Sequence, residues 1–516
     1  SDLNDFKPDI VYIFTSYRNL THGPSFSDKK NDVDGMLENV LDRHTSMWSA
    51  IKTRFNVPII QNNYEYAPTR DLGNIDTQDF RGTNHFILEL NRLLKNSADK
   101  VSGVYLNDIH YLSAKIGLAQ WHDSQYWYAF KYAMSQLGMM QTAHSSSRII
   151  NAIYGKSKKC LILDLDNTLW GGVIGDDGED GILLGQGEAK GEAYQDFQKY
   201  IKRLSDRGVI LSVASKNEHA IAKTGFNHSQ TILKYEDFSS FKANWGPKDQ
   251  SIRDICFEIN IGLDSTVFLD DNPAERLRVE SEISEIVVPP LPVEPFTYVD
   301  ILDRGQFFEP LKIVDDDLKR KQFYSDNLKR SDLKSNFSNY DDYLKSLEMA
   351  ATISKPSRAQ LERVTQLINK TNQFNLTTKR LTYSEVDSIW QSQNSLILAG
   401  QLKDKFGDNG LISVIIGNKI GSALEIVLWI MSCRVLKRGM ENAMLDKLVK
   451  SSTEMGISQL IGEYIPTAKN ALVRNHYQDL GFSAHNATKA TGSNESTKWL
   501  LDIKNTQKTY NQFIEV

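Results

Sequence analysis

One ten-residue segment constrains this chain more than any other: residues 163–172 read LDLDNTLWGG and continue an apolar run, CLI. The apolar run predicts a buried strand, and Asp164 and Asp166 lie where that strand ends. Two carboxylates one residue apart can divide the work of phosphoryl transfer, because one can attack phosphorus while the other moves a proton. A divalent cation would offset their charge. The segment therefore predicts a phosphoryl-transfer site at the end of a strand.

Three later segments supply the remaining groups that such a site needs. The apolar run VILSVAS ends in Ser215, whose hydroxyl can hold the transferred phosphoryl group. Lys248 is a cation that can neutralise an aspartate and a phosphate together. The run VFL is followed by Asp270 and Asp271, which offer the oxygen donors that magnesium selects. Because ligands of open α/β sheets bind at the carboxyl ends of the strands, we expect these groups to meet at one sheet edge.

Each of these groups has a simpler explanation when it is taken alone. Ser215 could cap a helix, Lys248 could be a surface charge, and the second acid pair could form a turn. Their order along the chain, with each acid or hydroxyl at a strand end, favours the catalytic interpretation. The expected roles are catalysis by Asp164, Asp166 and Lys248, phosphate binding by Thr168, Ser215, Lys216 and Asn217, and Mg²⁺ binding by Asp164, Asp166, Asp270 and Asp271.

Size, charge and cysteine content limit the functions open to the chain. Its 516 residues suffice for about three domains. The net charge of −5 gives no electrostatic case for nucleic-acid binding. Three separated cysteines without a C-x-x-C pair predict neither a disulfide framework nor a zinc site, and favour a reducing, cytoplasmic location. No apolar run approaches a membrane span and no signal peptide opens the chain, although its first residue, Ser1, leads us to expect an upstream portion.

Hydrophobic patterning divides the chain into successive parts, without tandem repeats. Residues 1–150 read as an α/β segment, with a strand at 9–14, amphipathic helices around 36–54 and 85–94, and a strand at 104–106. The patterning of these residues indicates no particular chemistry.

The next part alternates strand and helix and carries the acids. Residues 156–297 predict a parallel α/β core, in which a helix at 192–207 is ended by Gly208. The glycine-rich stretch at 171–178 predicts a flexible flap that is too short to be a cap domain, so the site would be open to a large partner. Residues 298–347 turn charged and helical and read as a connector.

The last part, residues 348–516, predicts a second α/β domain. Its elements are expected as two strands joined by a Gly-Asn turn, then a helix, a strand and a closing segment, at 410–417, 422–430, 440–454, 459–464 and 475–482. This order resembles the acyltransferase fold called GNAT. The phosphate-binding loop of that fold usually carries two glycines, but residues 434–441 provide only Gly439, so acetyl-CoA is not the expected donor.

The ordered motifs resemble those of the haloacid dehalogenase (HAD) superfamily. The longer strings CLILDLDNTLWGGVIGDDG, SKNE, NWGPK and VFLDDNPAER resemble the FkbH-like family, HAD subfamily IIIC, as do TNQFNLTTKR and MSCRVLKRGME. The resemblance covers nearly everything from about residue 120 onward. It implies an α/β protein of three domains: a degenerate SGNH-hydrolase-like segment, a HAD-like Rossmannoid parallel sheet with a minimal cap, and a GNAT-like domain. Because the Gly-Asp-Ser block of SGNH hydrolases is missing, we expect Ser16 to be an ordinary loop serine.

The resemblance also implies a function. Members of that family take a three-carbon unit from 1,3-bisphosphoglycerate, remove its phosphates, and load the glyceryl group on the phosphopantetheine thiol of an acyl carrier protein. A magnesium-dependent phosphatase coupled to glyceryl transfer for polyketide-type biosynthesis is therefore expected, with no nucleic-acid or membrane partner. The open alternatives are a stand-alone HAD phosphomonoesterase, a non-enzymatic scaffold, and acyl transfer in polysaccharide or lipid biosynthesis.

The two phosphates of that donor differ chemically. Carbon 1 carries an acyl phosphate that a thiolate can displace, whereas the phosphate on carbon 3 is an unactivated ester that needs a phosphatase site. We expect a cysteine to take carbon 1 and Asp164 to take the carbon 3 phosphate. Cys160 precedes Asp164 by four residues, roughly 13 Å at ~3.3 Å per residue, and so lies at the wrong end of the strand. Cys256 lies on an apolar helix face and is expected in the core.

Cys433 is the cysteine expected to carry the acyl group. It follows a predicted strand and precedes a helix, with Arg434, Lys437 and Arg438 close by, and both surroundings favour a thiolate. Arg434 and Arg438 are expected to bind substrate phosphate. The alternative is that Cys433 is buried and inert, as free cysteines usually are. His476 and Tyr477 could position a pantetheine arm, although Tyr477 fits a core position equally well.

Overall fold

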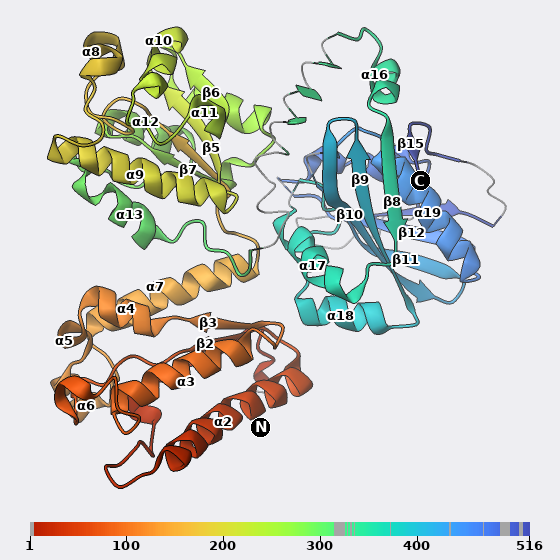
Figure 1. The fold of residues 1–516 in the computed structure, drawn as a ribbon. Helices are drawn as coiled ribbons and strands as arrows, with labels where there is room; N and C mark the ends of the chain where they lie inside the picture. Colours follow the sequence, from red (N-terminus) through yellow and green to blue (C-terminus); the bar gives the residue numbers. More distant parts are fainter. Residues whose placement is uncertain are drawn as a thin grey trace. The chain divides into compact units, whose positions relative to one another are not determined.

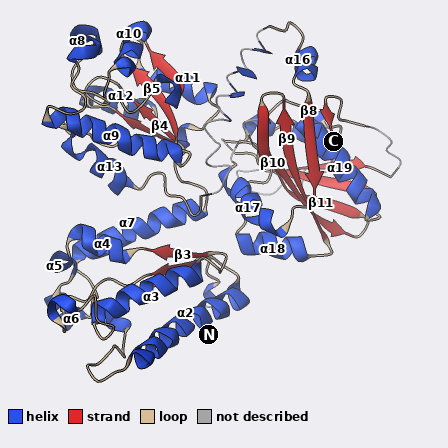
Figure 2. Ribbon diagram, in the orientation of Figure 1, coloured by secondary structure: helices blue, strands red, loops and turns tan. Residues whose placement is uncertain are grey.

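A computed structural model provides the structure. It describes residues 5–313, 323, 326, 327, 329, 330, 333, 334, 336–371, 373–432, 435–467, 469–485, 496–504 and 509–516. The chain folds into two compact units, Ser1–Tyr154 with Leu381–Ser388, and Gly155–Arg380 with Ile389–Val516. Both units combine helices with sheets, which confirms the predicted α/β class (Figure 2).

The first unit is built on a small parallel sheet. Its strands are β1 (Val11–Ile13), β2 (Ile59–Asn62) and β3 (Val104–Asn107), in that order. Its helices are α2 (Lys30–Phe55), α3 (Thr83–Ala98), α4 (Ile109–Ile116), α5 (Leu118–Trp121), α6 (Ser124–Phe130) and α7 (Gln136–Ile153). Helix α2 is longer than predicted and ends at Phe55, after which the capping residue Asn56 takes the left-handed conformation at φ 54. Trp48 of α2 and Phe86 of α3 are buried in the core of this unit.

The second unit contains a four-stranded, fully parallel sheet (Figure 1). The predicted acids directly follow two of its strands. Its strands, in spatial order, are β6 (Phe238–Ala243), β5 (Ile210–Ser215), β4 (Cys160–Leu163) and β7 (Thr266–Leu269). The accompanying helices are α8 (Ile174–Gly181), α9 (Ala189–Asp206), α10 (His219–Thr224), α11 (Lys248–Glu258), α12 (Pro273–Glu282) and α13 (Tyr298–Gly305).

Both faces of this sheet are covered, because its central strands are buried along their whole length. On one face Leu161 and Leu163 join a hydrophobic cluster with residues of α9 and α13, including Phe197. On the other face Cys160 and Ile162 join a cluster with residues of α11 and α12. This alternation follows the two-residue period of a strand and leaves the carboxyl edge of the sheet free for polar groups.

Two segments around this sheet differ from the expectations. The stretch predicted as a flap contains helix α8, which is kinked at Gly178 with φ 70, and Gly171 pairs with Leu183 behind it. Helix α13 lies in the stretch predicted as a connector, yet its Tyr298 and Leu302 are buried in the core of the parallel sheet. Apolar residues spaced on one helix face outweigh the charged composition of that stretch.

The second unit also contains an eight-stranded sheet. The strands lie in the order β13-β14-β12-β11-β10-β9-β8-β15, in which β11 and β12 are parallel and connected through a helix. The strands are β8 (Met349–Ser354), β9 (Ser395–Asp404), β10 (Gly407–Ile420), β11 (Ala423–Met431), β12 (Gln459–Tyr464), β13 (Ser483–Ala484), β14 (Thr497–Asp502) and β15 (Ile514–Glu515). The helices of this part of the second unit are α16 (Tyr340–Ser346), α17 (Leu361–Lys370), α19 (Met440–Glu454) and α20 (His476–Asp479). Most of α18 (Tyr383–Gln391) belongs to the first unit.

Helix α19 and strand β12 have the predicted bounds, but the predicted turn was wrong. Gly417 lies inside β10, at a shift in its pairing with β11, and a side chain there would collide with Leu424. The hairpin turns instead at Gly421 and Ser422, where Gly421 has φ +60. A two-residue hairpin turn needs this left-handed conformation, which glycine adopts without strain.

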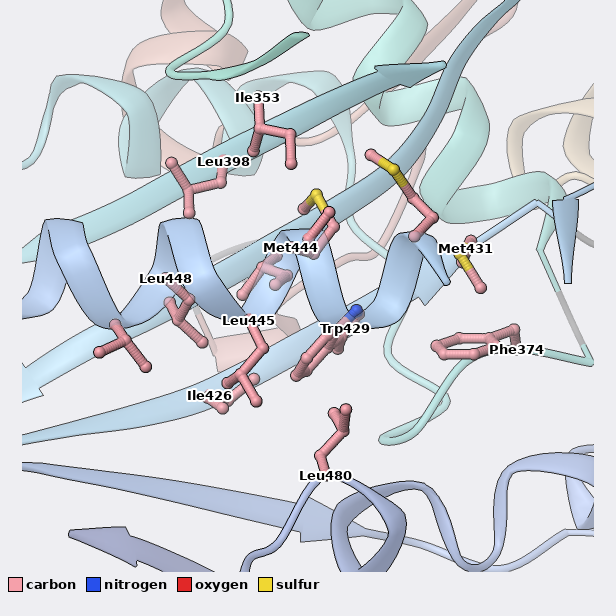
Figure 3. Packing of buried hydrophobic residues seen from close by; sticks show 14 of the residues in the cluster. Ile353, Phe374, Leu398, Ile426, Trp429, Met431, Met444, Leu445, Leu448 and Leu480 are labelled. Atoms are coloured by element: carbon pink, nitrogen blue, oxygen red, sulfur yellow. The ribbon is translucent and has the colours of Figure 1, made fainter. Parts of the chain in front are cut away.

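Helix α19 packs its apolar face on this sheet (Figure 3). Met444, Leu445 and Leu448 of the helix lie in one buried cluster with Ile426 and Trp429 of β11. His476 and Tyr477 belong to the same region. Tyr477 is 1 % exposed, and burial lowers the pKa of His476 to about 3. Both side chains are therefore packing groups of the core in this structure.

Candidate phosphoryl-transfer site

The acids of the site are positioned by two neighbouring parallel strands. Leu163 of β4 pairs with Leu269 of β7, so Asp164 and Asp270 follow these strands side by side. The backbone N–H of Asp164 donates to the carbonyl of Leu269 at 2.9 Å and continues the ladder. Carboxylate oxygens of Asp164, Asp270 and Asp271 lie within 4.8 Å of one another. The structure thus brings three of the four expected metal ligands together at the carboxyl edge of the sheet.

Lys248 joins the two most buried acids. Its Nζ donates to Asp164 Oδ2 at 2.7 Å and to Asp270 Oδ2 at 2.6 Å, and the lysine is only 4 % exposed. Burial opposes the charge on Lys248, but the two carboxylates outweigh it and raise the pKa of the lysine. Burial and then the negative charge of Asp164 raise the pKa of Asp270 to about 6. One cation therefore neutralises two carboxylates, whereas the sequence predicted that Lys248 would neutralise one aspartate and a phosphate.

Asp166 is held apart from this cluster by three donors. Its Oδ1 accepts from the indole Nε1 of Trp170 at 2.9 Å and from the backbone N–H of Ile174 at 3.1 Å. Its Oδ2 accepts from Asn217 Nδ2 at 2.9 Å. Burial raises the pKa of Asp166 despite these donors. The carboxylate of Asp166 is thus fixed by these three donors and is not part of the three-carboxylate group.

The indole of Trp170 is itself immobilised by packing. Trp170 is fully buried and lies edge-on against Phe226, with ring centroids 5.4 Å apart. A Cβ atom added to Gly225 would lie 2.7 Å from the Trp170 ring, so only glycine leaves room for it there. The hydrogen bond to Asp166 therefore depends on the absence of a side chain at position 225.

The expected phosphate-binding residues have distinct roles in the structure. Thr168 is buried, and its Oγ1 accepts from the backbone N–H of Asp271 at 3.2 Å, so it orients the second acid pair. Ser215 is buried at the end of β5, beside the site. Lys216 is ion-paired with Glu275 of α12. Asn217 contacts Asp166, which makes it a positioning group for that acid.

Some groups of the site were not expected from the sequence. Arg276 Nη1 donates to the carbonyl oxygens of Asp270 at 2.8 Å and Asp271 at 2.6 Å, and so fixes the loop after β7. The string NPAER after the acid pair contains this arginine, but its spacing alone does not reveal a contact back to the preceding loop. Trp170 and Ile174 lie in the string CLILDLDNTLWGGVIGDDG, but no role was expected for either residue.

The thiol site expected in the carboxyl-terminal part is only partly visible. Cys433 and Arg434 lie outside the described residues. Arg438 is buried, and its guanidinium donates to Asp404 at 3.3 Å and to Asn327 at 3.0 Å. The other two cysteines are buried, Cys160 in β4 and Cys256 in α11, and burial raises the pKa of both thiols. Neither has the surroundings of a reactive thiol.

Ser16, the serine after the first strand of the chain, has a local structural role. Its Oγ accepts from the backbone N–H of Arg18 and caps a short 3₁₀ helix, Tyr17–Asn19. This agrees with its expected role as an ordinary loop serine. Separately, none of the helices in the described part of the chain is both long and apolar enough to cross a membrane.

The donor set fits a hard divalent cation such as Mg²⁺. The three clustered groups are all carboxylates, and Asp164 Oδ1 is buried and accepts no hydrogen bond from any described residue. A buried carboxylate oxygen without a partner is costly, and a cation bound there would satisfy it. Asp164, Asp270 and Asp271 would hold such an ion.

Comparisons with known proteins agree with this geometry. The parallel sheet and its acid edge define a phosphatase fold of the HAD type. A crystal structure of the N-terminal part of BF1531 from Bacteroides fragilis, which contains a phosphatase domain complexed with Mg, is 34 % identical and has a TM-score of 0.56. The match covers 60 % of this chain and 82 % of that chain. The chain belongs to the same family as BF1531.

Two further likenesses are more limited. Enolase-phosphatase E1 from Marinobacter nauticus is 35 % identical over 103 residues, which are 19 % of this chain. The chain spans only 43 % of the length of that curated relative. The ribosomal-protein-S18-alanine N-acetyltransferase of Escherichia coli is 17 % identical over 31 % of this chain, with a TM-score of 0.24. No family model matches the chain.

Proposed function

We propose that the chain is a magnesium-dependent HAD-type phosphatase coupled to glyceryl transfer. The observation that carries the phosphatase half is the cluster of Asp164, Asp270 and Asp271, in which Lys248 is bonded to the two buried acids, Asp164 and Asp270. Phosphoryl transfer needs a nucleophile, a cation and charge neutralisation in one place, and this edge of the sheet provides them. The Mg²⁺ reported with BF1531 supports the choice of metal.

In the proposed reaction Asp164 attacks the phosphorus of the carbon 3 phosphate, and the ester oxygen leaves. Asp166, held by Trp170 and Asn217, gives that oxygen its proton. A water molecule then attacks the phosphoaspartate, Asp166 takes its proton, and phosphate is released. Bound Mg²⁺ would offset the charge of the phosphoryl oxygens. Lys248 stabilises the same charge throughout, because it remains beside Asp164.

The acyl half of the proposal concerns carbon 1 of 1,3-bisphosphoglycerate. The thiolate of Cys433 would displace the acyl phosphate, forming a thioester and releasing phosphate. The phosphopantetheine thiol of an acyl carrier protein would then take the glyceryl group and leave the Cys433 thiolate. This half is supported by the family resemblance and by the sequence around Cys433. The product would feed a polyketide-type pathway.

The test follows both halves by intact-protein mass spectrometry and phosphate release. Wild-type protein given 1,3-bisphosphoglycerate and Mg²⁺ should gain an adduct that hydroxylamine removes, and a candidate carrier protein should then acquire the glyceryl group. Cys433→Ala should lose the adduct but still hydrolyse a simple phosphomonoester. Asp164→Asn should lose hydrolysis, whereas Asp254→Asn, a change of an exposed acid on α11, should not. Unimpaired loading by Cys433→Ala would refute the covalent relay, and hydrolysis by Asp164→Asn would refute the phosphatase assignment.

A second candidate is a stand-alone phosphomonoesterase, which the local match to an enolase-phosphatase favours. Such an enzyme needs no cysteine and no carrier protein. It predicts that wild-type protein hydrolyses phosphomonoesters but neither acquires an acyl adduct nor loads any carrier. The same mass measurements therefore separate the two candidates.

A further inference from the structure

The strand order of the eight-stranded sheet raises the question of whether it takes a coenzyme A ester. Two parts of such a ligand need specific backbone groups of the protein. Its pyrophosphate needs backbone N–H groups, such as those at a helix N-terminus, and its amide-containing arm needs a strand edge with unpaired backbone groups. The sheet has a candidate for each: the N-terminus of α19, and the edge of β11 beyond the point where it parts from β12.

The strand edge is occupied by the chain itself. Strands β11 and β12 pair only as far as Ile426 and Gly462. Beyond that point a segment that we call the inserted segment, residues 374–377, lies against β11. Leu376 N–H donates to the carbonyl of Trp429 at 3.3 Å, and the N–H of Met431 donates to the carbonyl of Phe374 at 3.2 Å.

The inserted segment is also hydrogen-bonded to the chain just after β12, on the other side of the gap between β11 and β12. The N–H of Ile465, just after β12, donates to the carbonyl of Leu376 at 2.8 Å, and Asn470 Nδ2 donates to the carbonyl of Asn375 at 2.9 Å. All four residues of the segment are buried, with Leu376 at 0 % exposure. The backbone groups that an extended arm would use are therefore already bonded, and the segment is anchored by buried side chains.

The helix N-terminus is occupied as well. The loop before α19 turns through two left-handed residues, Lys437 at φ 62 and Gly439 at φ 85. Its amides face the carboxylate of Glu441, whose Oε1 accepts from the N–H of Lys437 at 3.3 Å. Burial raises the pKa of Glu441, while hydrogen bonds from the backbone of Glu441, Lys437 and Gly439 favour its ionised form. The carboxylate of Glu441 thus occupies the backbone donors that a phosphate would need. Its negative charge would also repel the phosphate.

We propose that the carboxyl-terminal domain does not bind coenzyme A esters, because Glu441 and the inserted segment take the places of the pyrophosphate and the arm. The conclusion does not depend on the proposed phosphatase. A second step rests on the acyl half of the proposed function: the acyl donor would then be a compound without a nucleotide, such as an acyl phosphate.

The test is calorimetric titration of the full chain in magnesium-free buffer with a chelator, so that the acid cluster has no metal to bind phosphates. Coenzyme A, acetyl-CoA and inorganic pyrophosphate are the probes. Wild-type protein should show no saturable binding of any probe at up to about millimolar concentration. Glu441→Ala should show saturable pyrophosphate binding within that concentration range, roughly tenfold or more tighter than the limit set by wild type, which is the size of one lost repulsion at contact distance. Glu454→Ala, at the exposed far end of α19, should match wild type.

The coenzyme probes separate the two parts of the proposal. Glu441→Ala should bind coenzyme A no more tightly than pyrophosphate, because the inserted segment still occupies the edge of β11. Glu441→Gln removes the charge but keeps the shape, and should show a smaller gain than Glu441→Ala. Micromolar binding of coenzyme A or acetyl-CoA by wild-type protein would overturn the proposal. An unchanged affinity of Glu441→Ala for pyrophosphate would overturn the role of Glu441.

Discussion

Replacing Lys248 by methionine keeps much of the side-chain volume but removes the positive charge from between Asp164 and Asp270. Among the residues that the structure describes, no other cation is bonded to two buried carboxylates. The Nζ atom lies 2.7 Å from Asp164 Oδ2 and 2.6 Å from Asp270 Oδ2, and both acids are less than a tenth exposed. Breaking a buried ion pair costs about 3–5 kcal/mol, because the partner charge stays buried without compensation. Here one cation serves two anions, so we expect a loss at the upper end of that range.

The loss should depend on conditions that supply another positive charge. Mg²⁺ bound to the same carboxylates should restore part of the stability, about 2.7 kcal/mol at a concentration one hundred times its dissociation constant. Lower pH should act in the same direction. The pKa of Asp270 is already raised to about 6 with Lys248 present, and without the lysine Asp270 holds its proton more tightly. The variant should therefore lose stability as pH rises from 5 to 8.

Hydrogen exchange measured by mass spectrometry on peptides covering β4 and β7 reports the local opening free energy. Lys216→Met is the matched control, because Lys216 is also ion-paired but is more than a third exposed, and its loss should cost less than about 1 kcal/mol. Equal losses of protection in the two variants, or a loss in Lys248→Met that neither Mg²⁺ nor pH 5 reduces, would refute the electrostatic account.

Three further predictions concern single side chains. Asp270→Ala should raise the Mg²⁺ concentration needed for half-maximal phosphate release, and an unchanged requirement would exclude Asp270 as a ligand. Asn217→Ala should lower kcat roughly 10–100-fold with little change in KM, because Asp166 loses a charge-assisted hydrogen bond, whereas the exposed Asn227→Ala should leave both unchanged. Burial raises the pKa of Glu65 from 4.5 to about 8. Between these two pH values the folded state therefore binds one proton more than the unfolded state. The free energy of unfolding of the first unit should fall by about 1.4 kcal/mol per pH unit as pH rises through this range. Thermal unfolding of Glu65→Gln should lack this dependence, and parallel curves for variant and wild type would contradict it.

The sequence predicted best where local pattern and site chemistry coincide. The strands before Asp164 and Asp270 are short apolar runs that end in acids, and parallel pairing then places those acids together. The bounds predicted for helix α19 and strand β12 agree with the structure, in which alternate side chains of β12 are buried as expected for a strand. Lys248 was predicted as a neutralising cation only from the order of the motifs along the chain, because a lysine taken alone could equally be a surface charge.

The sequence predicted least well where contacts are set by residues far apart in the chain. Asn217 binds Asp166 across 51 residues, and that partnership leaves no local pattern. The hairpin turn was misplaced because Gly417-Asn418 and Gly421-Ser422 are both plausible turns, and only the pairing of β10 with β11 decides between them. The inserted segment is similar: its bonds to β11 and to Ile465 come from tertiary packing rather than from periodicity.

The space left by the missing side chain of Gly225 connects a residue that takes no part in the site with Trp170, which holds Asp166. Since an added methyl group would press on the ring whose N–H holds Asp166, substitutions at 225 and 170 are expected to be tolerated as pairs more often than singly. In a library that varies both positions together, larger residues at 225 should be recovered with smaller residues at 170, and such pairs should keep the fold while losing turnover. Selection for stability would then accept several residue pairs at positions 170 and 225, whereas selection for catalysis would keep tryptophan at 170 and glycine at 225.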